Sequence, residues 1–150
     1  MRAENMAIMV GTQTVIHDNP KLTTTHWSGR NPIRVTLDRH GKLDKHYNIF
    51  SDEAQTIVYH DNTDWHYVLA DLAQRNIHSI LVEGGATLLN HIIDTGIYDE
   101  IHIEVGTQHI GRGIKAPSID LTPYTPTIID GHRHYVINKN NPENEQCARF

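Results

Sequence analysis

Short apolar runs alternate along the chain with segments that carry apolar residues at helical spacing. The runs predict strands at residues 6–10, 32–38, 56–59 and 80–82. The first and last runs are continuously apolar, which is typical of parallel strands covered on both faces. The second run alternates, so Ile33, Val35 and Leu37 are expected to share one face.

Helical patterns follow three of these strands. Residues 12–17 predict a short helical turn, which Pro20 ends because a proline disfavours helix at the residue before it. Asp64 is expected to cap a helix with apolar residues on one face. A third helix should begin after Gly85 and end just before Gly96.

The C-terminal part of the chain has a different pattern. Residues 100–105 alternate between polar and apolar positions, and residues 106–126 hold three glycines and three prolines, which predicts a loop. Asp130-Gly131 lies between two β-branched runs and predicts a tight hairpin turn. The alternation of strands and helices predicts one α/β domain at residues 1–138, followed by a polar tail at 139–150. Its sheet should be mainly parallel and flanked by helices, with an antiparallel C-terminal hairpin at the edge.

Composition narrows the class of protein. A chain of 150 residues is long enough for one domain with its own core and too short for two ordinary ones. The formal net charge of −5 argues against nucleic-acid or anionic-membrane partners. The single cysteine, Cys147, excludes an internal disulfide, and no apolar run is long enough to span a bilayer. We therefore expect a cytoplasmic, soluble protein.

The strongest local motif is Glu83-Gly84-Gly85, where a predicted strand enters a predicted helix. Two glycines leave the N–H groups of the helix N-terminus uncovered, and the helix dipole there favours an anion such as phosphate. Glu83 would stand at the carboxyl end of its strand, where open α/β sheets bind their ligands. The alternative is a tight turn that binds nothing, because the motif is not the six-residue dinucleotide fingerprint.

Other candidate motifs are weaker. Residues 11–14 also join a strand to a turn, and their N–H and hydroxyl groups could hold phosphate or ribose, or only cap a helix. The twelve histidines do not predict a metal site. His102 and Glu104 share a strand face and mimic half of the zinc-deaminase motif, but the cysteine pair that completes it is absent.

Several segments, taken together and in order, resemble one family. They are residues 2–4, 7–14, 18–23, 31–35, 37–38, 81–86 and 96–101. This combination, which covers roughly residues 2–120, resembles the reductase domain of the bifunctional riboflavin-biosynthesis deaminase/reductase. The resemblance implies a dihydrofolate-reductase-like fold and a homodimer. It also implies NADPH-dependent reduction of 5-amino-6-(5-phosphoribosylamino)uracil to 5-amino-6-(5-phosphoribitylamino)uracil.

The resemblance also implies roles for matched residues. It places Arg2, Leu22 and Glu83 at the substrate, where a guanidinium suits a sugar phosphate and a carboxylate suits the pyrimidine edge. The residues that it places at the dinucleotide are Thr14, Asp18, Gly85, Ala86, Thr87, Leu88, Leu89, Asn90 and His91. The loop at residues 60–62 is the expected region for the 2′-phosphate that distinguishes NADPH from NADH. No proton donor and no metal are assigned.

The chain departs from the family pattern in three ways. Thr25 stands where the family usually has an arginine that helps to hold the substrate, although Arg30 is close in sequence. The family's first strand has no counterpart, so we expect an exposed sheet edge that another chain or a longer protein fills. The zinc-deaminase half is also absent. A second hypothesis therefore stays open, in which the chain is a truncated, non-catalytic relative that binds a nucleotide or serves in assembly.

Overall fold

The computed structural model describes residues 1–25 and 28–140. These residues fall into two compact units, one that runs from Met1 to Leu89 and one that begins at Asn90. Cys147 and nearly all of the predicted polar tail lie outside the described residues. Among the residues described, no helix is long and apolar enough to cross a membrane.

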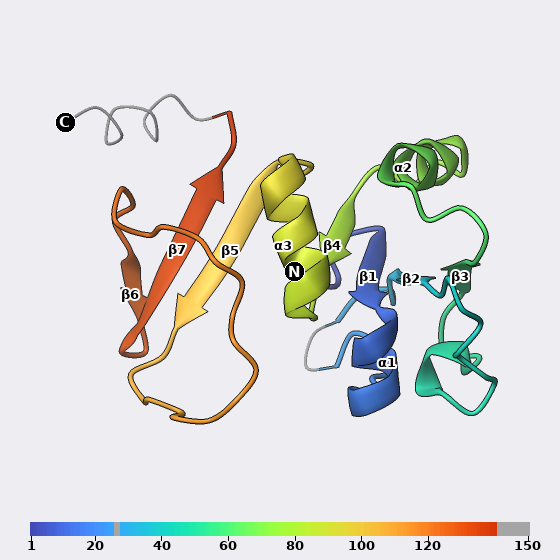
Figure 1. The fold of residues 1–150 in the computed structure, drawn as a ribbon, viewed down its shortest axis with the longest axis horizontal. Coiled ribbons are helices and arrows are strands. Elements are labelled where there is room, and N and C mark those ends of the chain that lie inside the picture. The colour runs from blue at the N-terminus through green and yellow to red at the C-terminus, as the bar shows by residue number, and fades with distance from the viewer. Residues whose placement is uncertain (26–27, 141–150) are drawn as a thin grey trace. The chain divides into compact units, whose positions relative to one another are not determined.

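The first unit is built on a parallel sheet of four strands in the order β3-β2-β1-β4 (Figure 1). Its elements are β1 (Ala7–Gly11), α1 (Thr12–Asp18), β2 (Ile33–Leu37), the 3₁₀ turn η1 (Asn48–Phe50), β3 (Thr56–Tyr59), α2 (Trp65–Gln74) and β4 (Ile80–Val82). Helix α3 (Ala86–Thr95) begins in this unit and ends in the second. The predicted strands and helices are confirmed to within a few residues at their ends. Asp64 caps α2 as expected, since its side chain accepts hydrogen bonds from two backbone N–H groups.

Strand β1 is the centre of this unit. Its first four residues are at most 1% exposed, so both faces are covered, as its continuous apolar run predicted. Ile8 and Val10 pack with Val15 of α1, with Leu22 and with Ile49 of η1. This cluster fixes α1 and the segment after it against the sheet.

Strand β2 departs from the one-sided burial that its alternating pattern predicted. Arg34, Val35 and Thr36 are all fully buried, whereas Ile33 and Leu37 are half-buried. The physical reason is that β2 pairs with β1 on one side and β3 on the other, inside a sheet that is covered on both faces. A charged side chain, Arg34, therefore lies inside the core.

The second unit contains an antiparallel sheet in the order β5-β7-β6. Its strands are β5 (Glu100–Val105), β6 (Thr127–Ile129) and β7 (His132–Asn138). Asp130 and Gly131, with φ of 50° and 81°, form the predicted hairpin turn between β6 and β7. Whereas we placed the hairpin at the edge of the parallel sheet, it pairs with β5 in a sheet of its own.

The apolar face of β5 explains this pairing. In the register of the two strands Ile101 lies opposite Ile137, and Ile103 lies opposite Tyr135. Ile137 and Tyr135 are buried, so the cross-strand pairs join the apolar positions of both strands on one face.

Candidate functional site

The carboxyl ends of β1 and β4 meet at the point where the strand order of the parallel sheet reverses. The chain adds β2 and β3 on one side of β1 and returns to its other side with β4. The Glu83 N–H donates to the Met9 carbonyl at 2.9 Å, which continues the ladder between these two strands. Open α/β sheets bind ligands at such a switch point, so this edge is the first place to look for a site.

Thr14 of α1 packs closely against the turn that follows β4. A Cβ atom added at Gly84 would lie 3.2 Å from Thr14 Cγ2, and one added at Gly85 would lie 3.2 Å from Thr14 Oγ1. Both glycines have φ of 72°, a conformation that L side chains rarely adopt. The two motifs singled out in the sequence, residues 11–14 and residues 83–85, are therefore brought together, and the turn leaves no room for side chains.

Arg2 and Glu83, 81 positions apart in the sequence, form a two-pronged ion pair. Arg2 Nε donates to Oε1 at 3.1 Å and Nη2 donates to Oε2 at 2.7 Å. The third nitrogen of the guanidinium, Nη1, donates to the Thr23 carbonyl oxygen at 3.2 Å. Hydrogen bonding to Glu83 raises the pKa of Arg2 above its usual value, although partial burial opposes the shift. The two side chains are 36% and 34% exposed, so a ligand can reach both.

Leu22 meets this corner only through its backbone. Its side chain is 3% exposed and packs in the core cluster beneath the sheet edge. Its φ of 55° is left-handed, which turns the chain sharply between Lys21 and Thr23. The resemblance placed this residue at the substrate, and the structure leaves its main chain, not its side chain, for that role.

The residues predicted to hold the dinucleotide lie on two helices. Thr14 and Asp18 are one turn apart on α1, and Asp18 is exposed at the last position of that helix. Gly85 directly precedes α3 and residues 86–89 form its start, where the Leu89 N–H donates to the Gly85 carbonyl at 3.1 Å. Asn90 and His91 belong to the second unit, where Asn90 Oδ1 accepts a hydrogen bond from the Ser118 N–H at 3.0 Å. The oxygen of Asn90 thus already holds a loop of its own unit.

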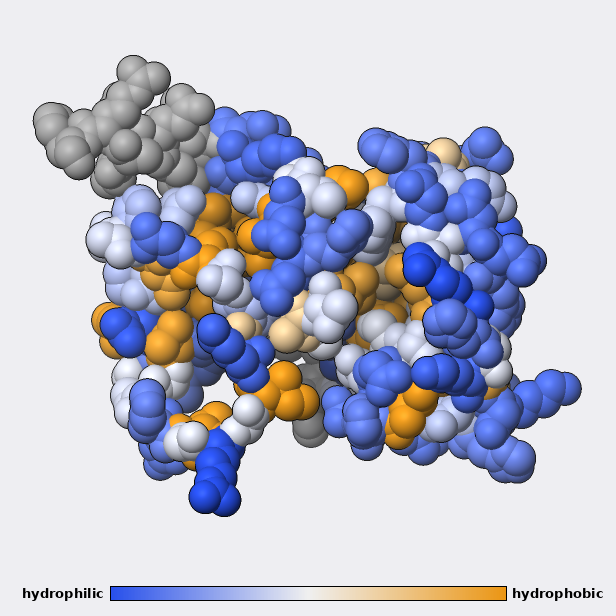
Figure 2. Space-filling model, viewed as in Figure 1, coloured by the Kyte–Doolittle hydropathy of each residue, from blue (hydrophilic) through white to orange (hydrophobic). Residues whose placement is uncertain are grey.

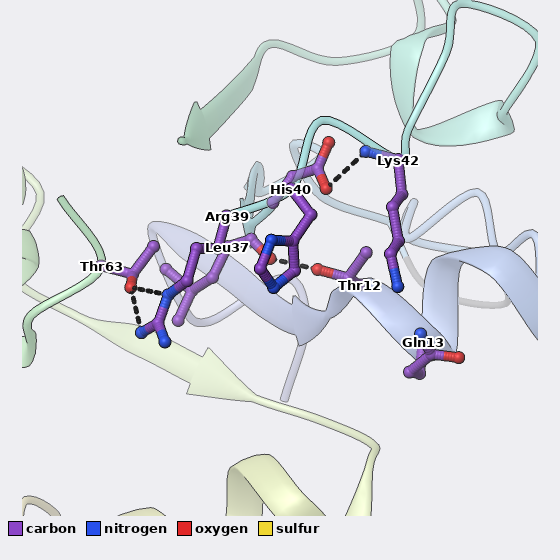
Figure 3. A pocket seen from close by; sticks show the side chains of 8 residues that line it. Thr12, Gln13, Leu37, Arg39, His40, Lys42 and Thr63 are labelled. Carbon is purple, nitrogen blue, oxygen red and sulfur yellow. Dashed lines mark hydrogen bonds between the residues drawn. The ribbon is translucent and has the colours of Figure 1, made fainter. Parts of the chain in front are cut away.

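A cavity of about 290 Å³ opens at the carboxyl ends of β1 and β2 (Figure 3). It is lined by Thr12, Gln13, Leu37, Asp38, Arg39, His40, Lys42 and Thr63. The side chains of His40 and Lys42 extend toward the first turn of α1, and Arg39 donates to the Thr63 hydroxyl at 3.0 Å from Nε (Figure 3). Three basic side chains therefore share one wall.

Asp38 lies in the same wall, but among the described residues its carboxylate forms no ion pair with Arg39, His40 or Lys42. Its carboxylate is fully buried and accepts hydrogen bonds from the N–H groups of Lys42 and Leu43, at 2.9 and 3.0 Å. The Thr12 hydroxyl donates to the Leu37 carbonyl and ties α1 to the end of β2. Sequence analysis missed this cavity, although a basic run directly after a predicted strand could have indicated it. His60, in the loop expected to serve a 2′-phosphate, contacts the Asp38 carbonyl oxygen through Nδ1 at 2.9 Å.

Two histidines of the antiparallel sheet pair with carboxylates. His102 lies 3.3 Å from Glu100, and His132 contacts Glu104. Within the described part of the chain, no three His, Cys, Asp or Glu side chains are grouped so that they could hold a metal ion.

Comparison with known proteins identifies the family. Residues 1–128 match the family model described as the RibD C-terminal domain. The chain belongs to this family. A similar relative is the 2,5-diamino-6-ribosylamino-4(3H)-pyrimidinone 5′-phosphate reductase of Methanothermobacter thermautotrophicus. It is 28% identical over an alignment 137 positions long, which covers 74% of this chain and 63% of the relative.

Solved structures confirm the dihydrofolate-reductase-like fold. The deaminase/5-amino-6-(5-phosphoribosylamino)uracil reductase of Thermotoga maritima superposes with a TM-score of 0.78 at 28% identity, over 92% of this chain and 46% of that one. Dihydrofolate reductase from Enterococcus faecalis, complexed with NADP(H), reaches a TM-score of 0.56 at 11% identity, over 92% of this chain and 77% of that one. This RibD-type domain spans under two thirds of the Methanothermobacter relative and under half of the Thermotoga protein.

We predict that Gly84→Ala destabilises the domain more than Gly41→Ala does. Both glycines have positive φ, so an alanine at either site adds about 1–2 kcal/mol of backbone strain. Only the alanine at Gly84 also meets Thr14, since nothing lies within 4 Å at Gly41. Urea unfolding of the two variants should therefore differ by about 1 kcal/mol or more. Equal losses would show that the contact with Thr14 is not tight.

Proposed function

We propose that this chain uses NADPH to reduce 5-amino-6-(5-phosphoribosylamino)uracil to the ribitylamino product. The observation that carries this proposal is the meeting of Arg2 and Glu83 beside Gly84-Gly85, at the switch point of a RibD-type domain. An arginine and a carboxylate at one place match a substrate that carries a phosphate at one end and N–H donors at the other. NADPH supplies the hydride, and the protein orients the two partners.

The substrate side of the site would use the ion pair directly. The guanidinium of Arg2 presents a planar fork that suits the phosphate oxygens, and its raised pKa keeps it charged. The carboxylate of Glu83 can accept hydrogen bonds from N–H groups of the pyrimidine. The named relatives act on two pyrimidines that differ at C2, which bears an amino group in one and an oxygen in the other. Both compounds are therefore substrates to assay.

The cofactor side would use the turn after β4 and the basic cavity. The glycines let Thr14 pack against this turn, so a pyrophosphate at the start of α3 would lie beside the Thr14 hydroxyl and the N–H groups of the first helical turn. The wall formed by Arg39, His40 and Lys42 suits a second anion, the 2′-phosphate of NADPH, which NADH lacks. Thr12 and Thr63 line the same cavity and can add hydroxyl groups. These residues support a preference for NADPH.

The alternative, a non-catalytic module, rested partly on Thr25. This residue is exposed, and the neighbouring Thr24 donates from its hydroxyl to the Arg30 carbonyl at 3.2 Å. This contact brings the main chain of Arg30 next to Thr24, one residue before the position where the family carries an arginine. Nothing in the described residues favours the alternative over the reductase.

We further propose that the chain forms a homodimer through its antiparallel sheet. Ile129 and Val136, each 48% exposed, lie on one face of this sheet, whereas Ile128 lies on the opposite face. Figure 2 shows apolar atoms at the surface over the strands of this sheet. Val136→Glu should weaken the dimer, which sedimentation equilibrium would measure, with Ile128→Glu as a control on the opposite face of the sheet. A wild-type chain that stays monomeric at high concentration would contradict the proposal.

Substrate-dependent NADPH oxidation should fall about tenfold or more in Glu83→Gln, because a charge-assisted hydrogen-bond acceptor is lost. Glu4→Gln is the control, since Glu4 is an exposed carboxylate that pairs only with the N-terminal amine among the contacts described. Steady-state kinetics with each of the two pyrimidines measures the effect. A wild-type chain that turns over neither pyrimidine would reject the reductase and leave the non-catalytic alternative.

Replacing Arg39 with alanine should raise the dissociation constant of NADPH about tenfold while changing that of NADH less than twofold. The reason is that the guanidinium is expected to contact only the 2′-phosphate, which makes a charge-assisted hydrogen bond. Fluorescence titration measures both constants, with Lys45→Ala as a control outside the cavity. Equal losses for the two cofactors would place the 2′-phosphate elsewhere.

A further inference from the structure

Arg34 of β2 is the largest fully buried side chain in the described part of the protein. Its Nη1 donates to the carbonyl oxygens of Lys21 and Asn48, at 3.3 and 2.9 Å, and to Ser51 Oγ at 3.1 Å. Its Nη2 donates to the carbonyl oxygens of Ser51, at 2.5 Å, and Ala54. Nε has no hydrogen-bond partner among the described residues.

This buried charge is held by carbonyl groups and not by a carboxylate. Desolvation lowers the pKa of Arg34, and the charge of Glu53 opposes the shift. Glu53 itself pairs with Lys21 Nζ at 3.1 Å and accepts a hydrogen bond from Ser51 Oγ at 3.1 Å. Burying a guanidinium without a directly bonded carboxylate is costly, so an apolar side chain would be the simpler way to fill this part of the core. The hydrogen bonds that Arg34 makes to carbonyl groups must therefore offset this cost.

Arg34 binds two segments that are far apart in the sequence, Lys21 and residues 48–54. The carbonyls of Asn48, Ser51 and Ala54 belong to η1 and to the chain that leads into β3. These contacts are structural and account for the packing of η1. The contact with the Lys21 carbonyl is different, because Lys21 begins the turn that ends at the candidate site.

The turn from Lys21 to Thr23 connects Arg34 to Arg2. Arg34 binds the carbonyl at its start, and Arg2 Nη1 donates to the carbonyl of Thr23 at its end. Between them Leu22 holds a left-handed φ of 55°, which costs a leucine about 1–2 kcal/mol. Such a conformation persists only where its surroundings fix it, and here the buried side chain of Leu22 and the two arginines do so.

We propose that Arg34 is a positioning residue for the substrate site. By holding the Lys21 carbonyl, it sets the Thr23 carbonyl where it orients Arg2 against Glu83. Arg34 itself is fully buried and touches neither substrate nor cofactor. This inference rests on the proposed function, since it assigns Arg34 to the substrate side of that site and not to the cofactor side.

The test is Arg34→Lys, which keeps the charge but lacks the planar fork that reaches several acceptors at once. The KM for 5-amino-6-(5-phosphoribosylamino)uracil should rise about fivefold or more, while the dissociation constant of NADPH stays within about twofold. A purely structural role would change both constants or neither. Arg75→Lys is the matched control, because Arg75 is an exposed arginine paired with Asp71.

A second readout does not depend on activity. The Arg2 Nε–H resonance, assigned by its loss in Arg2→Lys, should be distinct in the wild-type protein and move toward that of free arginine in Arg34→Lys. The backbone amides of β1 should keep their positions. If Arg34→Lys does not fold, the same Arg2 resonance is measured in Ser51→Ala. That variant removes one hydrogen-bond acceptor of Arg34 Nη1 and keeps Arg34 itself.

The outcomes separate the two proposals. An unchanged Arg2 resonance, an unchanged KM in an active variant, or an equal loss of NADPH binding overturns the role of Arg34. A wild-type protein without turnover overturns the proposed function, whereas the Arg2 resonance still tests whether Arg34 positions Arg2.

Discussion

The contact between Thr14 and the backbone of Gly84 and Gly85 is the constraint on which the candidate site depends. It joins the first turn of α1 to the turn after β4, across the point where the strand order reverses. Glu83 directly precedes these glycines, so the same contact sets how far its carboxylate lies from Arg2. A bulkier residue at either glycine would move the substrate side and the cofactor side together. The absence of two Cβ atoms thus couples the halves of the site.

The charge on the wall of the cavity has the opposite sign to the net charge of the chain. The chain carries a formal charge of −5, yet one wall of the cavity presents Arg39, His40 and Lys42. This is possible because the carboxylate of Asp38 is buried and bound to backbone N–H groups. The carboxylate therefore organises the loop that carries the basic residues. An anion that enters the cavity meets a field that the composition does not indicate.

The sequence predicted those features that depend on neighbouring residues. Gly84-Gly85 and Asp130-Gly131 predict turns, because tight turns need backbone conformations that most other residues rarely adopt. The structure confirms both turns. The burial of Arg34 could not be predicted, because the carbonyls that satisfy it come from two separate segments outside β2, Lys21 and residues 48–54. Family resemblance pointed to Leu22, but it could not say that the side chain of Leu22 faces the core.

The same distinction between local and long-range information applies to the sheets. The strands of the C-terminal part were predictable from their alternation, but the choice of partner was not. Strand β5 pairs with β7, which lies beyond a loop of some twenty residues, because their apolar positions face one another in register. The basic cavity was missed for a similar reason, since Thr12 and Thr63 come to the end of β2 only in the folded chain.

The ion pair of Arg2 and Glu83 has a consequence for selectivity under the proposed function. In the free protein each charge satisfies the other, and both side chains are only about a third exposed. A ligand that carries only a phosphate would take Arg2 and leave the partly buried carboxylate of Glu83 without its partner. A ligand that carries only pyrimidine N–H donors would leave Arg2 in the same position. Because an unpaired charge in such a place is costly, only a molecule with both groups at the right separation replaces what it breaks. The pair therefore favours a pyrimidine joined to a sugar phosphate over either fragment alone.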